Sequence, residues 1–148
     1  MELNDTVQRL ASNPLFSCLG PSKLKLIAFA SDYLVFRDGE TVFSQGDTAD
    51  GAYLVESGEA VVFTADGEKQ VQVNALYNSD IFGEMALILK SGRTATVKAR
   101  GELTVLKVDG DFFLKLVSEN PETALGVMMV LSERIASLSD KVAQSAQG

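Results

Sequence analysis

Residues 4–29 carry apolar side chains at the spacing of an amphipathic helix, with one interruption and one restart. Asn4 or Asp5 is expected to cap a first helix, which Asn13-Pro14 ends. Pro21 is suited to the first position of a second helix. The first thirty residues are therefore predicted to form a helical segment that packs on the remainder of the chain.

The pattern then changes to a period of two, which is typical of strands with one buried face. Val71, Val73 and Ala75 alternate with polar neighbours, for example. Short apolar runs of this kind fill residues 31–108 and are separated by pairs of turn-forming residues. Regular strands at this spacing predict an antiparallel β-barrel of the jelly-roll kind. The turn pairs are Asp38-Gly39, Gln45-Gly46, Ser57-Gly58 and Asp66-Gly67.

Helical spacing returns in residues 109–145, where Asp109 or Asp111 can cap a helix that Asn120-Pro121 interrupts. A longer helix is predicted to follow, with apolar residues in steps of three and four that resemble a heptad seam. This seam can pack against the chain's own barrel or against a second copy in a symmetric homodimer, and we keep both possibilities. Its members are Ala124, Met128, Leu131, Ile135, Leu138 and Val142.

Together these patterns predict a mixed α+β fold in a single domain that spans residues 1–148. The predicted parts are N-terminal helices (1–30), an antiparallel β-barrel (31–108) and two C-terminal helices (109–145). At 148 residues, with 46% hydrophobic and 22% charged residues, the chain can bury an ordinary globular core.

Composition and charge exclude several classes of function. The net charge of −7 and the lack of a basic stripe argue against nucleic acid as a direct partner. No apolar run approaches the ~18 residues of a membrane span, and the acidic, polar N-terminus is unlike a secretory signal. We therefore expect a cytoplasmic protein that does not contact a membrane.

The absence of histidine bears on catalysis. Without histidine the chain cannot form a Ser-His-Asp triad, a histidine-built zinc site or a histidine-ligated haem. The single cysteine, Cys18, permits no internal disulfide, and its apolar surroundings favour a small buried thiol. We expect neither an enzyme nor a bound cofactor or metal.

The stretch FGEMALILKSGRTATVKA, residues 82–99, carries the chemistry. Gly83 permits a left-handed turn, and Glu84 then begins a short helix whose first N–H groups have no internal partner. Arg93 follows the next turn and can bring a guanidinium group to the same place. This combination suits a ligand with both a phosphate and a sugar diol. The alternative is an exposed loop ion pair, worth about 0–1 kcal/mol.

The same stretch resembles the phosphate-binding cassette of cyclic nucleotide-binding domains, F-G-E-x-A-L followed by a loop and R-(S/A/T)-A-x-V. The resemblance implies that Glu84 holds the ribose 2′-hydroxyl and Arg93 the cyclic phosphate, with nearby backbone amides completing the cradle. Gly92 departs from the family, which often has proline there. The implied ligand-binding residues are Gly83, Glu84, Met85, Ala86, Arg93, Thr94 and Ala95.

Other parts of the chain are similar to the same family. NPLF near the start is similar to its N-terminal bundle, and residues 39–63 are similar to its early strands. The resemblance places Val62 and Val73 on the wall beside the purine, although both can be ordinary core residues. It places Arg134 on a lid over the pocket, although a solvated arginine on a helix face fits equally.

The expected function is binding of a cyclic nucleotide, cAMP ahead of cGMP, with occupancy passed through the C-terminal helices to an unknown downstream protein. In the family a threonine at the place of Thr94 is associated with cGMP, so cGMP stays credible. One alternative is a ligand-free interaction or dimerisation domain of the same fold. Another is the sensor part of a larger regulator, such as a transcription factor, a channel or a kinase. A small barrel enzyme of the cupin kind would need histidine ligands.

Overall fold

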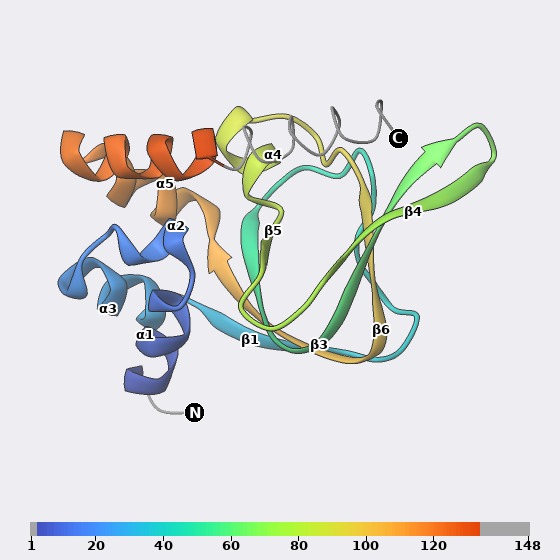
Figure 1. The fold of residues 1–148 in the computed structure, drawn as a ribbon, viewed down its shortest axis with the longest axis horizontal. Helices are drawn as coiled ribbons and strands as arrows, with labels where there is room; N and C mark the ends of the chain where they lie inside the picture. Colours follow the sequence, from blue (N-terminus) through green and yellow to red (C-terminus); the bar gives the residue numbers. More distant parts are fainter. Residues whose placement is uncertain (1–2, 134–148) are drawn as a thin grey trace.

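The computed structural model describes residues 3–133, apart from the side chains of Asp66 and Met85. Three helices open the chain and lie together at one end of the sheet (Figure 1): α1 (Leu3–Ala11), α2 (Pro14–Ser17) and α3 (Pro21–Phe29). Asn13 caps the start of α2, because its side-chain oxygen accepts the Leu15 N–H at 2.9 Å. The prediction that Asn4 or Asp5 caps α1 is wrong, since both residues lie inside that helix.

The strands form one antiparallel sheet in the order β1-β6-β3-β4, with β2 also on β6 and β5 also on β3. The two long strands, β3 and β6, pair with each other over most of their length and carry the shorter ones. No pairing joins β1 to β4 in the described chain, so the jelly-roll sheet is curled but not closed. The bounds are β1 Asp32–Phe36, β2 Thr41–Phe43, β3 Gly51–Asp66, β4 Lys69–Leu76, β5 Ile81–Phe82 and β6 Thr96–Asp109.

Strand β4 differs from the prediction. Val62 pairs with Asn74 but the next residue, Phe63, pairs with Gln72, so Val73 is the extra residue of a β-bulge. The hairpin of β3 and β4 projects from the body of the domain (green, Figure 1), and β4 forms an edge of the sheet. Val73 is consequently 56% exposed instead of buried in a core face.

The buried apolar side chains form two clusters. One lies between the helices and the near ends of the strands and includes Phe16 and Phe113, whose rings meet edge to face at 5.6 Å. The other lies within the curl of the sheet and includes Tyr53, Phe82 and Val97. This second cluster forms the bed of the site described below.

The C-terminal part begins as predicted. Asp109 caps α5 (Gly110–Ser118) by accepting the Phe112 N–H at 3.0 Å. The chain is helical again over 121–133. Its inward positions are Thr123 and Val127, whereas Met128 of the predicted seam is 61% exposed. The buried positions are therefore one residue away from Ala124 and Met128 of the seam, whereas Leu131 packs against the first cluster. The seam's last three members lie outside the described residues.

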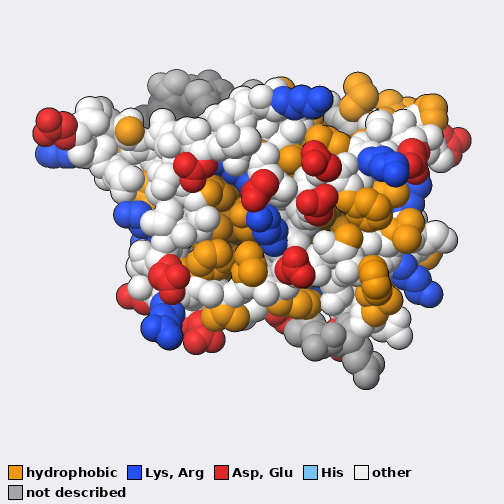
Figure 2. All heavy atoms as spheres, turned by 180° about the vertical axis from the view of Figure 1, so that it is seen from behind, with side chains coloured by type: hydrophobic (Ala, Val, Ile, Leu, Met, Phe, Trp, Pro, Cys, Tyr) orange, Lys and Arg blue, Asp and Glu red, His pale blue; other side chains and the backbone are white. Residues whose placement is uncertain are grey.

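The surface carries charges of both signs. On the face shown in Figure 2, lysine and arginine side chains are interspersed with acidic ones and form no continuous stripe. Among residues 3–133 no helix has the length and apolar character needed to cross a membrane.

Candidate functional site

Gly83 makes the turn between β5 and α4 (Glu84–Leu89). Its φ of 84° is left-handed, a conformation that costs a residue with a Cβ about 1–2 kcal/mol. A Cβ at this position would also lie 2.6 Å from Nη1 of Arg93. Glycine is therefore required here both by the backbone angle and by the arginine that packs against it.

The loop that carries Arg93 is tied to a second loop. The Arg93 N–H donates to the Asp47 carbonyl and the Gly46 N–H donates to the Arg93 carbonyl, both at 2.8 Å. Gly92 packs against the Gly46 carbonyl, which a Cβ at 92 would approach to 3.2 Å. The glycine that stands where the family often has proline therefore serves close packing between the two loops.

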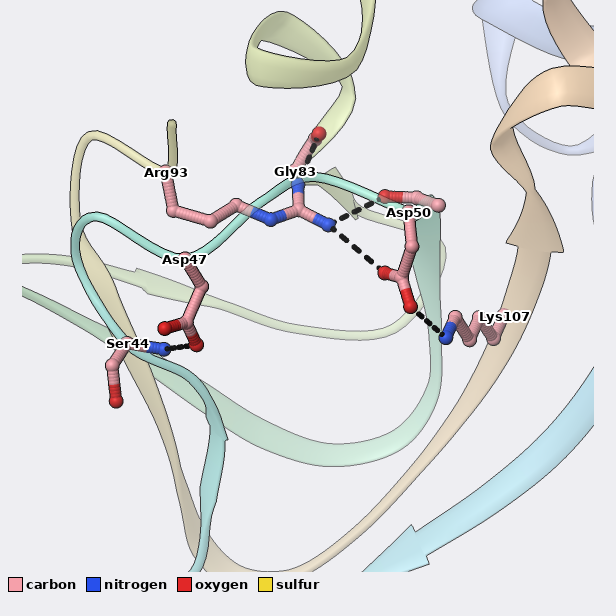
Figure 3. Close-up of polar contacts among 7 residues, drawn as sticks. Ser44, Asp47, Asp50, Gly83, Arg93 and Lys107 are labelled. Carbon is pink, nitrogen blue, oxygen red and sulfur yellow. Dashed lines mark hydrogen bonds and ion pairs between the residues drawn. The ribbon is translucent and has the colours of Figure 1, made fainter. Parts of the chain in front are cut away.

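The guanidinium group of Arg93 is aimed at backbone carbonyls and one carboxylate (Figure 3). Nη1 donates to the Gly83 carbonyl, and Nη2 donates to the Gly51 carbonyl at 2.8 Å. Nη2 also lies 3.7 Å from Oδ1 of Asp50, whose other oxygen accepts from Lys107 Nζ at 2.7 Å. The arginine is thus positioned by two separate segments of the chain, Gly83 and residues 50–51.

Aromatic rings form the bed beneath this group. The Cζ atom of Arg93 lies 4.1 Å from the centre of the Phe43 ring and 5.8 Å from that of Tyr53. Tyr53 in turn stacks on Phe82 with ring centres 5.1 Å apart. The guanidinium therefore has a fixed plane before any ligand arrives.

The two charged residues predicted to hold the ligand are both buried, with Glu84 and Arg93 each 3% exposed. This contradicts the alternative of an exposed loop ion pair. Burial lowers the pKa of Arg93, although neighbouring acidic groups such as Asp50 oppose the shift. The hydrogen bond from Lys107 lowers the pKa of Asp50 and so keeps that carboxylate ionised.

One donor of Arg93 is left over. Its Nε is buried and, within the described part of the chain, has no hydrogen-bond partner. Leaving a buried donor unsatisfied costs about 1–3 kcal/mol. Arg93 also belongs to the lining of the cavity described next, so an acceptor on a ligand that reaches this donor would satisfy it.

A cavity of about 210 Å³ brings most of the predicted residues together. Met85 lies in the first turn of α4, and its side chain is not among those that the structure describes. Val73 does not line the cavity, and its prediction as a wall residue is wrong because the bulge leaves it exposed. Arg134 lies outside the described residues. The predicted residues that line the cavity are Val62, Gly83, Glu84, Ala86, Arg93, Thr94 and Ala95.

Sequence reasoning missed the rest of the lining. Three of the missed residues form a single row across four strands with the predicted Val62: Asn74 pairs with Val62, Val62 with Val97, and Val97 with Phe43. Strand alternation alone cannot find this row, because it depends on the register between strands and on the bulge in β4. The missed residues are Phe43, Asn74, Leu76, Ile81, Phe82 and Val97.

A curled antiparallel sheet whose cavity holds a buried carboxylate and a buried guanidinium defines a domain suited to a small anionic ligand. No group of three or more potential metal ligands comes together in residues 3–133. The family model of the cyclic nucleotide-binding domain matches residues 33–120, more than half of the chain. The chain therefore belongs to the cyclic nucleotide-binding domain family.

Known proteins similar to this chain include regulators. The cAMP-dependent protein kinase regulatory subunit of Mucor circinelloides is 41% identical over 91 residues, which cover 62% of this chain and 21% of that protein. The match thus spans about a fifth of the length of this curated relative.

Two solved structures share the fold. The sensor domain of the transcriptional regulator DNR from Pseudomonas aeruginosa has a TM-score of 0.82 at 24% identity and covers 93% of both chains. The regulatory domain of Toxoplasma gondii PKA, crystallised with cAMP, has a TM-score of 0.77 at 26% identity. That match covers 91% of this chain and 50% of the other.

Proposed function

We propose that this domain binds a cyclic nucleotide, with the ring phosphate at Arg93 and the ribose at Glu84. The observation that carries the proposal is the buried Nε of Arg93, a charged donor that has no acceptor in the described chain and belongs to a residue that lines the cavity. A phosphate oxygen would supply that acceptor, and a charge-assisted hydrogen bond contributes about 1.5–3 kcal/mol. The Glu84 carboxylate on the same wall suits a ribose hydroxyl, which is a hydrogen-bond donor.

Support for cAMP comes from similar proteins. The Mucor relative is named for cAMP dependence, and the Toxoplasma domain was crystallised with cAMP. Support for cGMP comes from Thr94, a cavity residue whose hydroxyl can accept a hydrogen bond from the guanine 2-amino group. We therefore place cAMP first and keep cGMP as the second ligand.

Binding is expected to enlarge the cavity. Its volume of about 210 Å³ is below the ~300–1,000 Å³ that is usual for small-molecule sites. Arg93 is now held by the carbonyls of Gly83 and Gly51, so a phosphate would compete with these contacts. A shift of α4 relative to the start of β3 at Gly51 is the simplest way to admit the ligand.

Such a shift would reach the C-terminal helices through Leu87. This side chain of α4 is buried in the same cluster as Phe113, and it leaves no room for a Cβ at Gly110, the first residue of α5. Leu89, at the end of the same helix, is 65% exposed and makes no such contact with the cluster. We propose that occupancy is transmitted from α4 to α5 and from there to a downstream protein.

Hydrogen exchange tests the transmission. Adding saturating cAMP should change amide exchange over residues 110–118, a segment that does not line the cavity. Unchanged exchange in α5, together with protection confined to residues 82–99, would leave binding intact and refute transmission by this route.

A thermal melt tests binding itself. A ligand present at a hundredfold excess over its dissociation constant adds about 2.7 kcal/mol to stability. For a domain of this size that corresponds to an upward shift of roughly 5–10 °C. We expect this shift with cAMP or cGMP and not with 5′-AMP, which lacks the ring phosphate. No shift with either cyclic nucleotide would favour the ligand-free interaction domain.

The cellular location, the larger protein and the oligomeric state of the domain are part of the same proposal. We propose a cytoplasmic location and a role as the sensor part of a regulatory protein, in keeping with the much longer Mucor relative. A homodimer through the helix that begins at residue 121 is also proposed, and its test is given in the Discussion.

A further inference from the structure

Lys107 on β6 is the closer of two cations that contact the carboxylate of Asp50. Its Nζ lies 2.7 Å from Oδ2, whereas Nη2 of Arg93 lies 3.7 Å from Oδ1. The three side chains lie in series (Figure 3), and of the two cations Arg93 lines the ligand cavity while Lys107 does not. The polar route from Lys107 to a ligand in this cavity therefore runs through Asp50 and Arg93.

The backbone beneath Lys107 directs its side chain toward Asp50. Gly51 follows Asp50, and a Cβ at Gly51 would lie 3.2 Å from Cε of Lys107. The lysine stem thus occupies space that the glycine leaves free. Nζ of Lys107 lies 5.8 Å from the centre of the Tyr53 ring, and Cζ of Arg93 lies at the same distance from that centre. The two cations are therefore held by one carboxylate and one aromatic ring.

The Asp50 carboxylate can act on the site in two opposing ways. It contacts the same Nη2 of Arg93 that the Gly51 carbonyl holds, so it helps to orient the guanidinium. It is also an anion beside the place proposed for an anionic ring phosphate, which it repels and with which it competes for Arg93. Lys107 offsets this repulsion and competition, because it pairs with the carboxylate at the shorter distance.

We propose that Lys107 is a positioning residue that raises the affinity for the phosphate by keeping Asp50 from competing for Arg93. This inference rests on the proposed function, in which the ring phosphate lies at Arg93. The side chain of Asp50 is 64% exposed, so solvent and salt screen its charge and the expected effect is moderate. Without Lys107, the carboxylate would pair with Arg93 alone and the ligand would meet a stronger competitor.

Calorimetric titration of cAMP into a double-mutant cycle tests the inference. Lys107→Met keeps an unbranched stem without the charge, and its dissociation constant should rise roughly threefold to fivefold at about 0.15 M salt. The same substitution in an Asp50→Asn background should have no effect, because the carboxylate on which Lys107 acts is gone. Lys107→Arg keeps the charge and should bind cAMP within about twofold of wild type.

The cycle separates this route from one through α5. Lys107 also lines a second cavity, of about 350 Å³, together with Asp32 and Asp109, and Asp109 caps α5. A lysine that acted on the site through that helix would not depend on Asp50. An equal loss of affinity in the native and the Asp50→Asn backgrounds would therefore overturn the inference.

Lys98→Met is the matched control. Lys98 lies on the same strand, but its Nζ donates to Oε1 of Gln70 at 3.2 Å and it does not line the cavity. Its loss changes the net charge by the same amount and should leave the affinity unchanged. An equal loss in Lys98→Met would mean that net charge alone is responsible, and would overturn the inference.

Wild-type affinity in Lys107→Met would also overturn the inference, while nucleotide binding would stand. Absence of cAMP binding by wild type would overturn the proposed function along with it.

Discussion

Arg93 illustrates how one residue serves both the fold and the site. Its guanidinium joins the Gly83 and Gly51 carbonyls, the Asp50 carboxylate and the ring of Phe43. These contacts use both terminal nitrogens and leave Nε over. Pre-organisation of this kind lowers the entropic cost of binding, because the arginine does not have to be ordered by the ligand.

Gly83→Ala tests the close approach on which this arrangement depends. The new Cβ would lie 2.6 Å from Nη1 of Arg93. The alanine would also have to adopt a φ of 84°, which is unfavourable for a residue with a Cβ. We expect a loss of about 2–3 kcal/mol in unfolding free energy by urea denaturation, together with weaker nucleotide binding.

Gly39→Ala provides the matched control for that substitution. Gly39 has a φ of 83° but no atom within 4 Å of its ideal Cβ position. The Gly39→Ala variant should lose only the conformational contribution, about 1–2 kcal/mol of unfolding free energy. Equal losses in the two variants would show that Arg93 yields to the added methyl group without cost.

At the residue scale the sequence was informative where chemistry is local. Gly83, Glu84 and Arg93 follow one another at a fixed spacing, and the structure places all three on one cavity. Asn74 and Phe43 could not be predicted in the same way, because they reach the site only through strand register. Val73 was wrongly predicted to line the cavity, because a period-two sequence pattern does not reveal a β-bulge.

At the scale of elements, α5 links the sheet to the C-terminal helix. It begins directly at the end of β6, and its cap is the side chain of Asp109, which bonds the Phe112 N–H at 3.0 Å. Its buried residues Phe113 and Leu116 pack in the cluster shared with α2 and α3. The start of this helix is therefore held both by the Asp109 cap and by the close contact between Leu87 and Gly110.

Asp109→Ala should destabilise the domain by about 1 kcal/mol, because an N-terminal N–H of the helix loses its acceptor. Chemical denaturation would measure the change. Asp111→Ala is the control, since this acidic residue lies in the first turn of α5 and makes no capping bond. A loss at Asp111 as large as that at Asp109 would mean that charge near the helix start, and not the cap, is what stabilises α5.

The helix over 121–133 shows why the predicted seam was displaced. Spacing in threes and fours fits several neighbouring faces of one helix, and tertiary packing selects among them. Here Thr123 and Val127 face the domain, while Leu125, Met128 and Met129 are exposed. An apolar face left exposed among residues 121–133 keeps the homodimer proposal open.

At the scale of the whole molecule, the prediction is that two copies associate through this face. Light scattering on the full chain should give twice the monomer mass at micromolar concentration. Met128→Glu should return the mass to that of a monomer, because a carboxylate would be buried without a partner. Leu26→Glu is the control, since Leu26 on α3 is similarly exposed on a different element. A monomeric wild type would refute the dimer without bearing on the ligand.

The measurement that tests the central claim most directly is a calorimetric titration of cAMP into wild type, Arg93→Ala and Arg100→Ala. Arg100 pairs with Glu59 at 2.9 Å and does not line the cavity, so it controls for loss of an arginine elsewhere on the sheet. We predict binding by wild type, unchanged affinity in Arg100→Ala and a loss of about a hundredfold in Arg93→Ala, provided that circular dichroism shows each variant folded. Folded Arg93→Ala with wild-type affinity, or a wild type that takes up no cyclic nucleotide, would contradict the account.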